Sequence, residues 1–366
     1  MNILHLAFQI GISKKLHRTG WLMKGIKNPE SVAEHCFRVS VLSMVMAKTL
    51  GVDQEKLTKM AIIHDIGETA TGDLVVQTGA AIDKKERIEK EKVEREAIRH
   101  ILFGYGEDYS KLFQEMINRK TREAVIFHEL DQLEKAIQAY EYEKEYGLDL
   151  SEFIIGAEAN IKHPSLKKVI ESLKMLRKKK KVKNGILDLA LQVGISKRIL
   201  RTGWVVRKVK DPESVAEHCF RVIVMCLVLA PAFGIDEQKL VNMGIIHDLG
   251  ETSTGDLVVE SWRKVFVKKR DVKEKLEKEA IKDIFKDFGN EYFGLFEEMI
   301  DRNSVEAKLF WQIDNLERTI QAFEYERSQG INMIEFVESA DEFVINPLLR
   351  EVLGDLKKIR ISEKRK

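Results

Sequence analysis

Residues Pro29 to Val39 are PESVAEHCFRV, and the same letters return 183 residues later, from Pro212 to Val222. The same register, without a gap, aligns His64-Asp65 with His247-Asp248 and Asp131 with Asp314. Solenoid and propeller repeats have periods of roughly 20–50 residues, so this period is far too long for a repeat array. The sequence therefore indicates a whole domain that occurs twice.

The join between the copies is a basic stretch, RKKKKVKNG, at residues 177–185. Such a run is typical of the charged C-terminal end of a helix that continues into a solvated linker. A nucleic-acid-binding segment is the less favoured alternative. We expect one domain at 1–177, a basic linker at 178–185 and the second domain at 186–366. Because this join spans at most roughly 30 Å, we predict that the domains lie close together with pseudo-twofold symmetry.

Composition favours a helical globular protein with a substantial core. The chain has 366 residues, of which 44% are hydrophobic, 33% are charged and only 5 are proline. A net charge of +2 indicates neither a nucleic-acid partner nor a membrane partner. The cysteines form no CxxC pair, which favours reduced thiols and a cytoplasmic location. The N-terminus lacks signal-peptide features, and the apolar run near 222–233 is expected to be too short to span a bilayer.

Local start and stop signals predict helices throughout each copy. Ser31 and Glu34 form a capping-box pattern that predicts a helix to about Leu50, and Asp53 is expected to cap the next helix. A polar turn is expected at 67–73. Further helices are predicted at 86–103, at 109–119, at 122–146 and after Ser165 as a cap. No segment shows sustained period-two alternation, so we predict an all-α fold.

Two histidines and two carboxylates fall on the inward faces of these predicted helices. His35 is in line with apolar positions at i+4 and i+7, His64 shares the inward face of its helix, and Asp65 follows it. Asp131 lies at the edge of an apolar helical face. One buried histidine is usually a structural core residue, but two imidazoles and two carboxylates buried together are costly without a cation. We therefore predict a divalent metal ion bound by these residues.

The second copy repeats the ligand set as His218, His247, Asp248 and Asp314. Of the nine histidines, only these two pairs have a histidine partner in the 183-residue register. Nitrogen and carboxylate ligands without a thiolate suit Mn²⁺, Fe²⁺, Co²⁺, Ni²⁺ or Zn²⁺ better than Ca²⁺. Four ligands leave room for water at an octahedral ion, as a hydrolytic site requires. We expect one such ion in each domain.

Two further acidic positions follow the His-Asp pair. Glu68, like Glu251 in the second copy, lies about one helical turn later and could serve as a general acid or base. Its structural alternative is a solvated turn residue. Asp73, like Asp256, could contact a substrate or could cap the next segment, and the residues alone leave both possibilities open.

Five motifs in order resemble the HD-domain phosphohydrolases, and among them the 5′-deoxynucleotidases that include oxetanocin-like proteins. The motifs of the first copy are RTGW at 18–21, PESVAEH at 29–35, IIHDIGE at 62–68, TGDL at 71–74 and LDQLEKAIQAYEYE at 130–143. The likeness covers nearly all of each copy and implies two tandem HD-domain helical bundles. It also implies that Glu68 and Glu251 are catalytic. The implied substrate contacts are Arg18 and Arg201 to phosphate, Trp21 and Trp204 beside the sugar, and Asp73 and Asp256 in the pocket.

The resemblance implies hydrolysis of deoxyribonucleoside 5′-monophosphates to nucleoside and phosphate. There are two alternatives to this activity. One is that of another HD-type phosphohydrolase (a phosphodiesterase, a deoxynucleoside triphosphatase or an alarmone hydrolase), and the other is a nucleotide-sensing scaffold with an inactive domain. Both copies keep every predicted ligand and the glutamate, which weighs against the scaffold. Relatives of this type are usually dimeric, so we expect an intramolecular pseudo-dimer that could oligomerise further. The copies differ at 77–81 and 260–264, the expected pocket rim, so their substrate preferences could differ.

Overall fold

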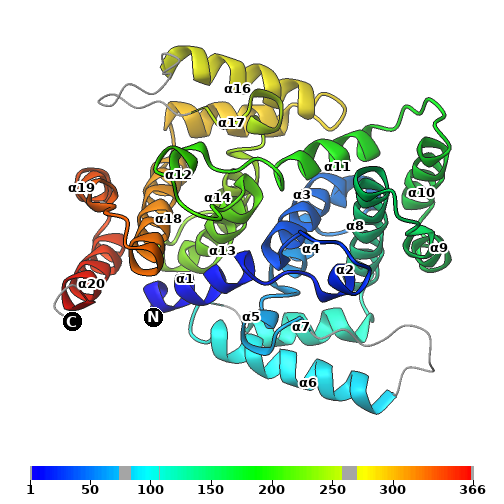
Figure 1. Cartoon of the computed structure of the whole chain (residues 1–366), viewed down its shortest axis with the longest axis horizontal. Helices are drawn as coiled ribbons and strands as arrows, with labels where there is room; N and C mark the ends of the chain where they lie inside the picture. The colour runs from blue at the N-terminus through cyan, green and yellow to red at the C-terminus, as the bar shows by residue number, and fades with distance from the viewer. Residues whose placement is uncertain (1, 74–83, 107, 258–269, 364–366) are drawn as a thin grey trace. The chain divides into compact units, whose positions relative to one another are not determined.

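The computed structural model describes residues 2–73, 84–106, 108–257 and 270–363 (Figure 1). Within these residues the regular secondary structure is helical, apart from two isolated β-bridges, His17–Ser31 and Leu200–Ser214. The prediction of an all-α fold is confirmed. The chain divides into two compact units. In each unit, two helices pack against one long helix at the centre.

One unit comprises Ser13–Phe103 and Glu107–Lys197. At its centre α3 (Val32–Leu50) packs against α4 (Gln54–Ile63) and α8 (Arg122–Tyr146), as Figure 1 shows. The surrounding helices are α2 (Thr19–Met23), α5 (Glu68–Thr71), α6 (Lys84–Ile101), α7 (Tyr109–Asn118), α9 (Ser151–Asn160), α10 (Pro164–Arg177) and α11 (Gly185–Ile195).

The other unit comprises Met1–Ile12, Gly104–Gly106 and Arg198–Lys366. Here α13 (Val215–Phe233) packs against α14 (Glu237–Ile246) and α18 (Val305–Gln329). The remaining helices are α1 (Ile3–Gly11), α12 (Thr202–Val206), α15 (Glu251–Thr254), α16 (Arg270–Ile284), α17 (Glu291–Asp301), α19 (Ile334–Phe343) and α20 (Pro347–Glu363).

The capping signals act as predicted. Ser31 Oγ accepts a hydrogen bond from the Glu34 amide at 3.2 Å, and the Ser31 amide donates to Glu34 Oε2 at 2.8 Å. This reciprocal pair satisfies two amides at the helix start that have no partner within the helix. Gly51, with a φ of 64°, ends α3 in the left-handed region that glycine adopts without a Cβ penalty. The Asp53 side chain accepts from the Lys56 amide and begins α4, as expected.

Three local predictions were wrong or incomplete. The stretch expected as a polar turn at 67–73 contains the short helix α5. The last helix of the copy is capped by the His163 side chain, not by Ser165, because Pro164 takes the first helical position and needs no amide partner. Helix α9 was not predicted, since its sequence mixes apolar and polar residues without a clear stripe.

The compact units do not follow the sequence repeat at their first helices. Helix α1 packs against α13, α18 and α20, whereas α11 packs against α3, α8 and α10. Each unit therefore takes its first helix from the other sequence copy. The buried apolar face of α1 provides the contact, through Ile3, Leu4, Leu6, Ala7 and Ile10. The predicted domain bounds 1–177, 178–185 and 186–366 describe the duplicated sequence and stay a prediction. The compact units differ from these bounds because α1 packs with the helices of the second copy and α11 with those of the first.

Glycines at the end of each first helix allow this close packing. A Cβ added to Gly194 would lie 2.4 Å from Glu141 Oε1 and 2.6 Å from Arg38 Nη1. A Cβ added to Gly11 would lie 2.7 Å from Arg221 Nη1. Because these contacts are shorter than real Cβ atoms tolerate, only glycine fits here without moving a buried ion pair.

Helix α13 is, among the described residues, long and apolar enough to cross a bilayer by length and composition. The expectation that this region is too short was therefore wrong about its length. However, 89% of the apolar window is buried inside the protein, where it packs against other helices.

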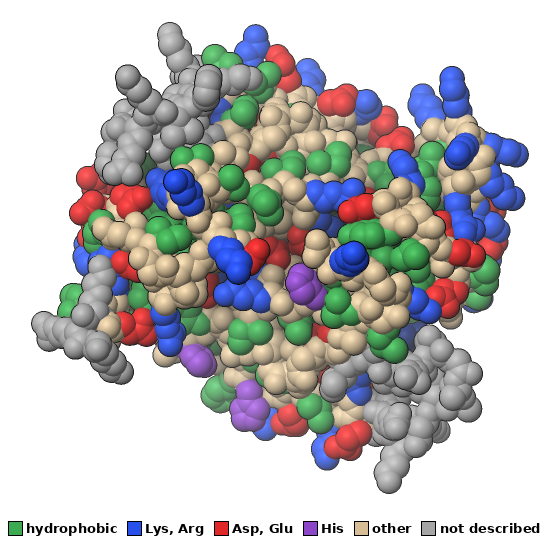
Figure 2. Space-filling view, viewed as in Figure 1, with side chains coloured by type: hydrophobic (Ala, Val, Ile, Leu, Met, Phe, Trp, Pro, Cys, Tyr) green, Lys and Arg blue, Asp and Glu red, His purple; other side chains and the backbone are tan. Residues whose placement is uncertain are grey.

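On the face seen in Figure 2, basic and acidic side chains are intermixed, in keeping with the balanced composition.

Candidate metal centre and active site

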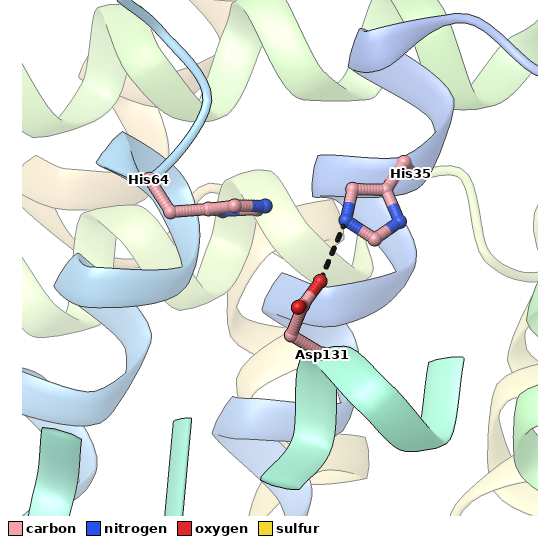
Figure 3. A group of neighbouring side chains, drawn as sticks. All are labelled: His35, His64 and Asp131. Carbon is pink, nitrogen blue, oxygen red and sulfur yellow. Dashed lines mark ion pairs between the residues drawn. The ribbon is translucent and has the colours of Figure 1, made fainter. Parts of the chain in front are cut away.

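The four predicted ligands of the first copy converge from three helices. His35 lies in the first turn of α3, His64 ends α4 with Asp65 next to it, and Asp131 lies in the middle of α8. His35 Nε2 is 3.2 Å from Asp131 Oδ1, and the rings of His35 and His64 lie 5.2 Å apart (Figure 3). Asp65 Oδ2 is 3.2 Å from His64 Nε2 and 3.9 Å from His35 Nε2.

The second copy has the same arrangement. His218 Nε2 is 3.1 Å from Asp314 Oδ1, and His247 Nε2 is 3.3 Å from Asp248 Oδ2. A third distance, 3.8 Å from His218 Nε2 to Asp248 Oδ2, closes the cluster. Two independent copies of the sequence therefore bring the same four side chains together.

The hydrogen bonds of the imidazoles indicate that the cluster fits a cation. His35 Nδ1 is 2.6 Å from Glu134 Oε2, and His64 Nδ1 is 2.7 Å from the Ala61 carbonyl. Both partners only accept, so we assign the ring proton to Nδ1 in each case. Each Nε2 then presents a lone pair to a carboxylate oxygen, and the buried His35 Nε2 has no hydrogen-bond partner. A divalent ion between these atoms would remove the repulsion.

A buried ionic network fixes the orientation of His35. Glu134 is fully buried, and its second oxygen accepts from Arg38 Nε at 2.9 Å and from Lys197 Nζ at 2.8 Å. Arg38 Nη2 also donates to Gln138 Oε1 at 2.7 Å. The second copy holds His218 through Glu317 and Arg221 in the same way. Partners of this type set the tautomer and basicity of metal-binding histidines. The sequence pattern had not singled out these partners, although each is retained in the 183-residue register.

Arg18 and Asp73 lie beside the cluster. Arg18 Nη1 forms an ion pair with Asp65 Oδ2. Although burial opposes its charge, Asp65 helps hold the pKa of Arg18 above its usual range. Asp73 accepts from the Thr19 amide at 2.5 Å, and the Thr19 hydroxyl donates to the Asp73 carbonyl at 2.9 Å. Asp73 therefore fixes the segment that carries Arg18 and also lines the cavity, whereas the residues that it was expected to cap, those directly after it, lie outside the described residues.

Glu68 lies at the start of α5 and is only 3% exposed, so the solvated-turn alternative is excluded. Burial raises the pKa of Glu68 well above its usual value, and the charge of Asp65 raises it further. Its Oε2 atom has no hydrogen-bond partner among the described residues. Glu251 repeats both properties in the second copy. A buried carboxyl with a raised pKa and an oxygen that has no hydrogen-bond partner can exchange a proton with a ligand.

Two charged residues of α6 complete the cavity and were not predicted. Lys90 Nζ lies 4.0 Å from Glu68 Oε1 and 3.2 Å from Glu94 Oε1. Burial raises the pKa of Glu94 to about 7, although Lys90 acts in the opposite direction. Lys273 and Glu277 occupy the corresponding positions in the second copy. The sequence signal for these two residues was that both copies keep them at corresponding positions. Because the helix carries many other charged residues, this signal did not stand out.

A cavity of about 340 Å³ adjoins the first cluster, and one of about 450 Å³ adjoins the second. The first is lined by Arg18, Glu68 and Asp73 together with ligands of the cluster. Trp21, the predicted sugar contact, is only 3% exposed, and its indole nitrogen donates to Glu30 Oε1 at 2.9 Å. Among the described residues it does not line the first cavity. Trp204 has the same buried setting but does line the second cavity. The predicted rim residues 77–81 and 260–264 lie outside the described residues.

Comparison with known proteins finds the same family twice along the chain. The HD domain family matches residues 10–173 and again 193–347. The 5′-deoxynucleotidase HDDC2 of Dictyostelium discoideum is 35% identical, covering 46% of this chain and 94% of its own length. The 5′-deoxynucleotidase HDDC2 of Danio rerio is 36% identical, covering 48% and 86%. A solved structure of a conserved hypothetical protein from Pyrococcus furiosus is 36% identical and covers 47% and 99%, with a TM-score of 0.41.

Both family matches contain a complete predicted ligand set, the first with His35 and Asp131 and the second with His218 and Asp314. The side chains present are ones that bind a transition-metal ion, and in each copy a histidine Nε2 atom lies within 3.2 Å of an aspartate oxygen. The chain belongs to the HD domain family, a family of metal-dependent hydrolases, and carries the domain twice.

Proposed function

We propose that both copies are phosphomonoesterases that hydrolyse deoxyribonucleoside 5′-monophosphates to nucleoside and phosphate. The observation that carries the proposal is the convergence of two imidazole Nε2 atoms and carboxylate oxygens beside a buried glutamate whose Oε2 atom has no hydrogen-bond partner. The names of the similar 5′-deoxynucleotidases support the substrate class. Each domain would hold one Mn²⁺, Fe²⁺, Co²⁺, Ni²⁺ or Zn²⁺ ion.

The ligands of that ion would be His35, His64, Asp65 and Asp131, with His218, His247, Asp248 and Asp314 in the second copy. When bound, the ion supplies Lewis-acid polarisation of the phosphoryl group and lowers the pKa of water. This assignment follows from the donor set and its convergence inside the helices.

The chain's own residues supply the remaining steps. Arg18 would leave its pairing with Asp65 in part and donate to the phosphoryl oxygens, where it offsets developing negative charge. Water adds to phosphorus and the bond from phosphorus to the 5′ oxygen breaks. Glu68 gives a proton to the leaving 5′ oxygen and takes up the proton that the attacking water loses, so its protonation state is restored. Asp73 holds the Arg18 segment in position.

A two-metal phosphodiesterase is the main alternative within the superfamily. A second group of possible ligands, Glu30, His35 and Glu134, lies behind the first. Lys197 pairs with both of these glutamates, and Arg38 pairs with Glu134. Two buried cationic side chains already balance these carboxylates, so the described residues favour one ion in the first copy.

The test is a phosphate-release screen of nucleoside mono-, di- and triphosphates and cyclic nucleotides, ribo and deoxy, with Mn²⁺, Co²⁺, Ni²⁺ and Mg²⁺. We expect the highest kcat/KM for deoxyribonucleoside 5′-monophosphates. His35→Ala and His218→Ala, made separately, should each abolish the activity of one site. No loss from either variant would exclude the enzyme and favour the nucleotide-sensing scaffold. The cytoplasmic location, the absence of nucleic-acid and membrane partners and the intramolecular pseudo-dimer stay predictions.

A further inference from the structure

The two cavities differ at one ring position on the long helix that carries the aspartate ligand. Trp311 of α18 corresponds to His128 of α8 in the 183-residue register. Trp311 Nε1 donates to the Met299 carbonyl at 2.8 Å, and His128 Nε2 lies 2.9 Å from the Met116 carbonyl. The two rings are therefore anchored in the same place by corresponding hydrogen bonds. The tryptophan extends a larger aromatic surface from that anchor.

In the second copy this ring belongs to a group of three planar side chains. The Arg302 guanidinium lies 5.4 Å from the Trp311 ring and 6.0 Å from the Phe343 ring. Phe343, the last residue of α19, is 48% exposed. The first copy keeps the arginine, Arg119, at the same helix end and with a similar positive φ. It replaces the two rings by His128 and Asn160.

The replacement of Trp311 and Phe343 by His128 and Asn160 changes how this region connects to the metal centre. Arg302, Trp311 and Phe343 line the same cavity as His247, Asp248 and Asp314. In the first copy, Arg119 and Asn160 line a separate cavity of about 340 Å³. Among the described residues, His128 alone lines both that cavity and the one at the metal centre. The second copy thus has one continuous cavity from its ligands to an aromatic surface.

Helix geometry places this surface at a useful distance. Trp311 lies three residues before Asp314, which corresponds to about 4.5 Å along the helix axis and the same face. Because one cavity joins the ligands to this surface, an ester whose phosphate lies at the metal centre has room to extend its far end towards Trp311. Exposed aromatic side chains beside an arginine are the groups on which nucleobases stack.

We propose that Trp311, Arg302 and Phe343 form a stacking subsite for the nucleobase in the second copy, and that the first copy lacks it. The inference rests on the proposed phosphomonoesterase function and deepens it. The second site selects phosphomonoesters that carry a planar base, whereas the first gains little from the base. Because every base has a π face, the subsite distinguishes the presence of a base more than its identity.

The test uses the full chain with one site disabled, by Asp65→Ala or by Asp248→Ala, so that each site is measured alone. For each, kcat/KM is determined for deoxyadenosine 5′-monophosphate and for 2-deoxyribose 5-phosphate, which lacks the base. We expect the ratio of the two values to be at least about fivefold higher at the second site than at the first. Trp311→His and Phe343→Asn, which install the residues of the first copy, should lower it towards the first-site ratio.

Phe293→Asn is the matched control, because Phe293 also has a cation over its ring, Lys282 at 5.9 Å, but does not line the cavity. It should leave the ratio unchanged. Equal ratios at both sites, or an unchanged ratio in Trp311→His and Phe343→Asn, would overturn the subsite. If neither site releases phosphate from any ester, the proposed function fails. Calorimetric binding of the same two ligands then decides the subsite separately, by whether Trp311→His weakens only the ligand that carries the base.

Discussion

Glu134 Oε2 lies 2.6 Å from Nδ1 of His35, and both side chains are fully buried. This contact makes the imidazole present its other nitrogen to the metal centre. It also joins that centre to a buried network of Arg38 and Lys197. Because Lys197 comes from the second sequence copy, the site of the first copy depends on a residue beyond its own repeat.

Glu134→Gln is expected to lower the metal affinity of the first site by roughly 10- to 100-fold. The neutral amide accepts more weakly from His35 and no longer raises the basicity of the ligand nitrogen. Calorimetric titration of chelator-stripped protein with Mn²⁺ measures the effect as one weakened site among two. Glu141→Gln is the control, since Glu141 pairs with Arg38 at 2.7 Å and has no described contact with His35. Equal losses in both variants would show that His35 needs the network's charge and not this hydrogen bond.

Glu68→Gln is expected to lower kcat of the first site by about 10²- to 10⁴-fold, because an amide cannot transfer the proton. The metal affinity should change little, since Glu68 is not a predicted ligand. The measurement is kcat with the second site disabled, together with a metal titration of the same variant. Retained kcat would remove Glu68 from the proton transfer, whereas a parallel loss of metal would assign it to the metal centre.

Glu94 and Glu277 should make stability fall as pH rises. Burial raises the pKa of each carboxyl to about 7 in the folded protein, against about 4.3 in an unfolded chain. Between these values the folded state binds more protons than the unfolded state, so the free energy of unfolding decreases with pH. In chelator-stripped protein, Glu94→Gln/Glu277→Gln should flatten the dependence of Tm on pH between about 4.5 and 7. An unaltered slope would contradict the buried, protonated state.

The exchanged helices predict that a substitution in one sequence copy destabilises the other. Leu6 of α1 and Leu189 of α11 occupy corresponding positions and are 2% and 3% exposed. Leu6→Ala should cost about 2–5 kcal/mol of stability through a cavity in the core. The loss of hydrogen-exchange protection should be concentrated in α13 and α18. Leu189→Ala is the reciprocal control and should affect α3 and α8, and loss of protection within the substituted copy would refute the exchange.

Much of the fold could be predicted because its determinants are local or repeated. The Ser31–Glu34 capping box, the Asp53 cap and the helical spacing of apolar residues are written in neighbouring positions. The convergence of the two histidines and two aspartates was predictable because these side chains lie on inward helix faces, where burial together is costly unless a cation offsets it. Their return in the second copy served as an internal comparison. Helix α9 and the His163 cap were missed because their signals are weak or use an uncommon capping side chain.

The sequence by itself determined the duplication, the helical class and the four-residue cluster of each copy. Only the tertiary structure decided which copy each first helix packs against. Since α1 and α11 carry the same motif and both copies offer the same receiving surface, no local pattern distinguishes the two pairings. The structure likewise decided that Glu134, Arg38 and Lys197 are buried. Along the chain they resemble solvated charged residues, and only packing removes water from them and makes their charges act on His35.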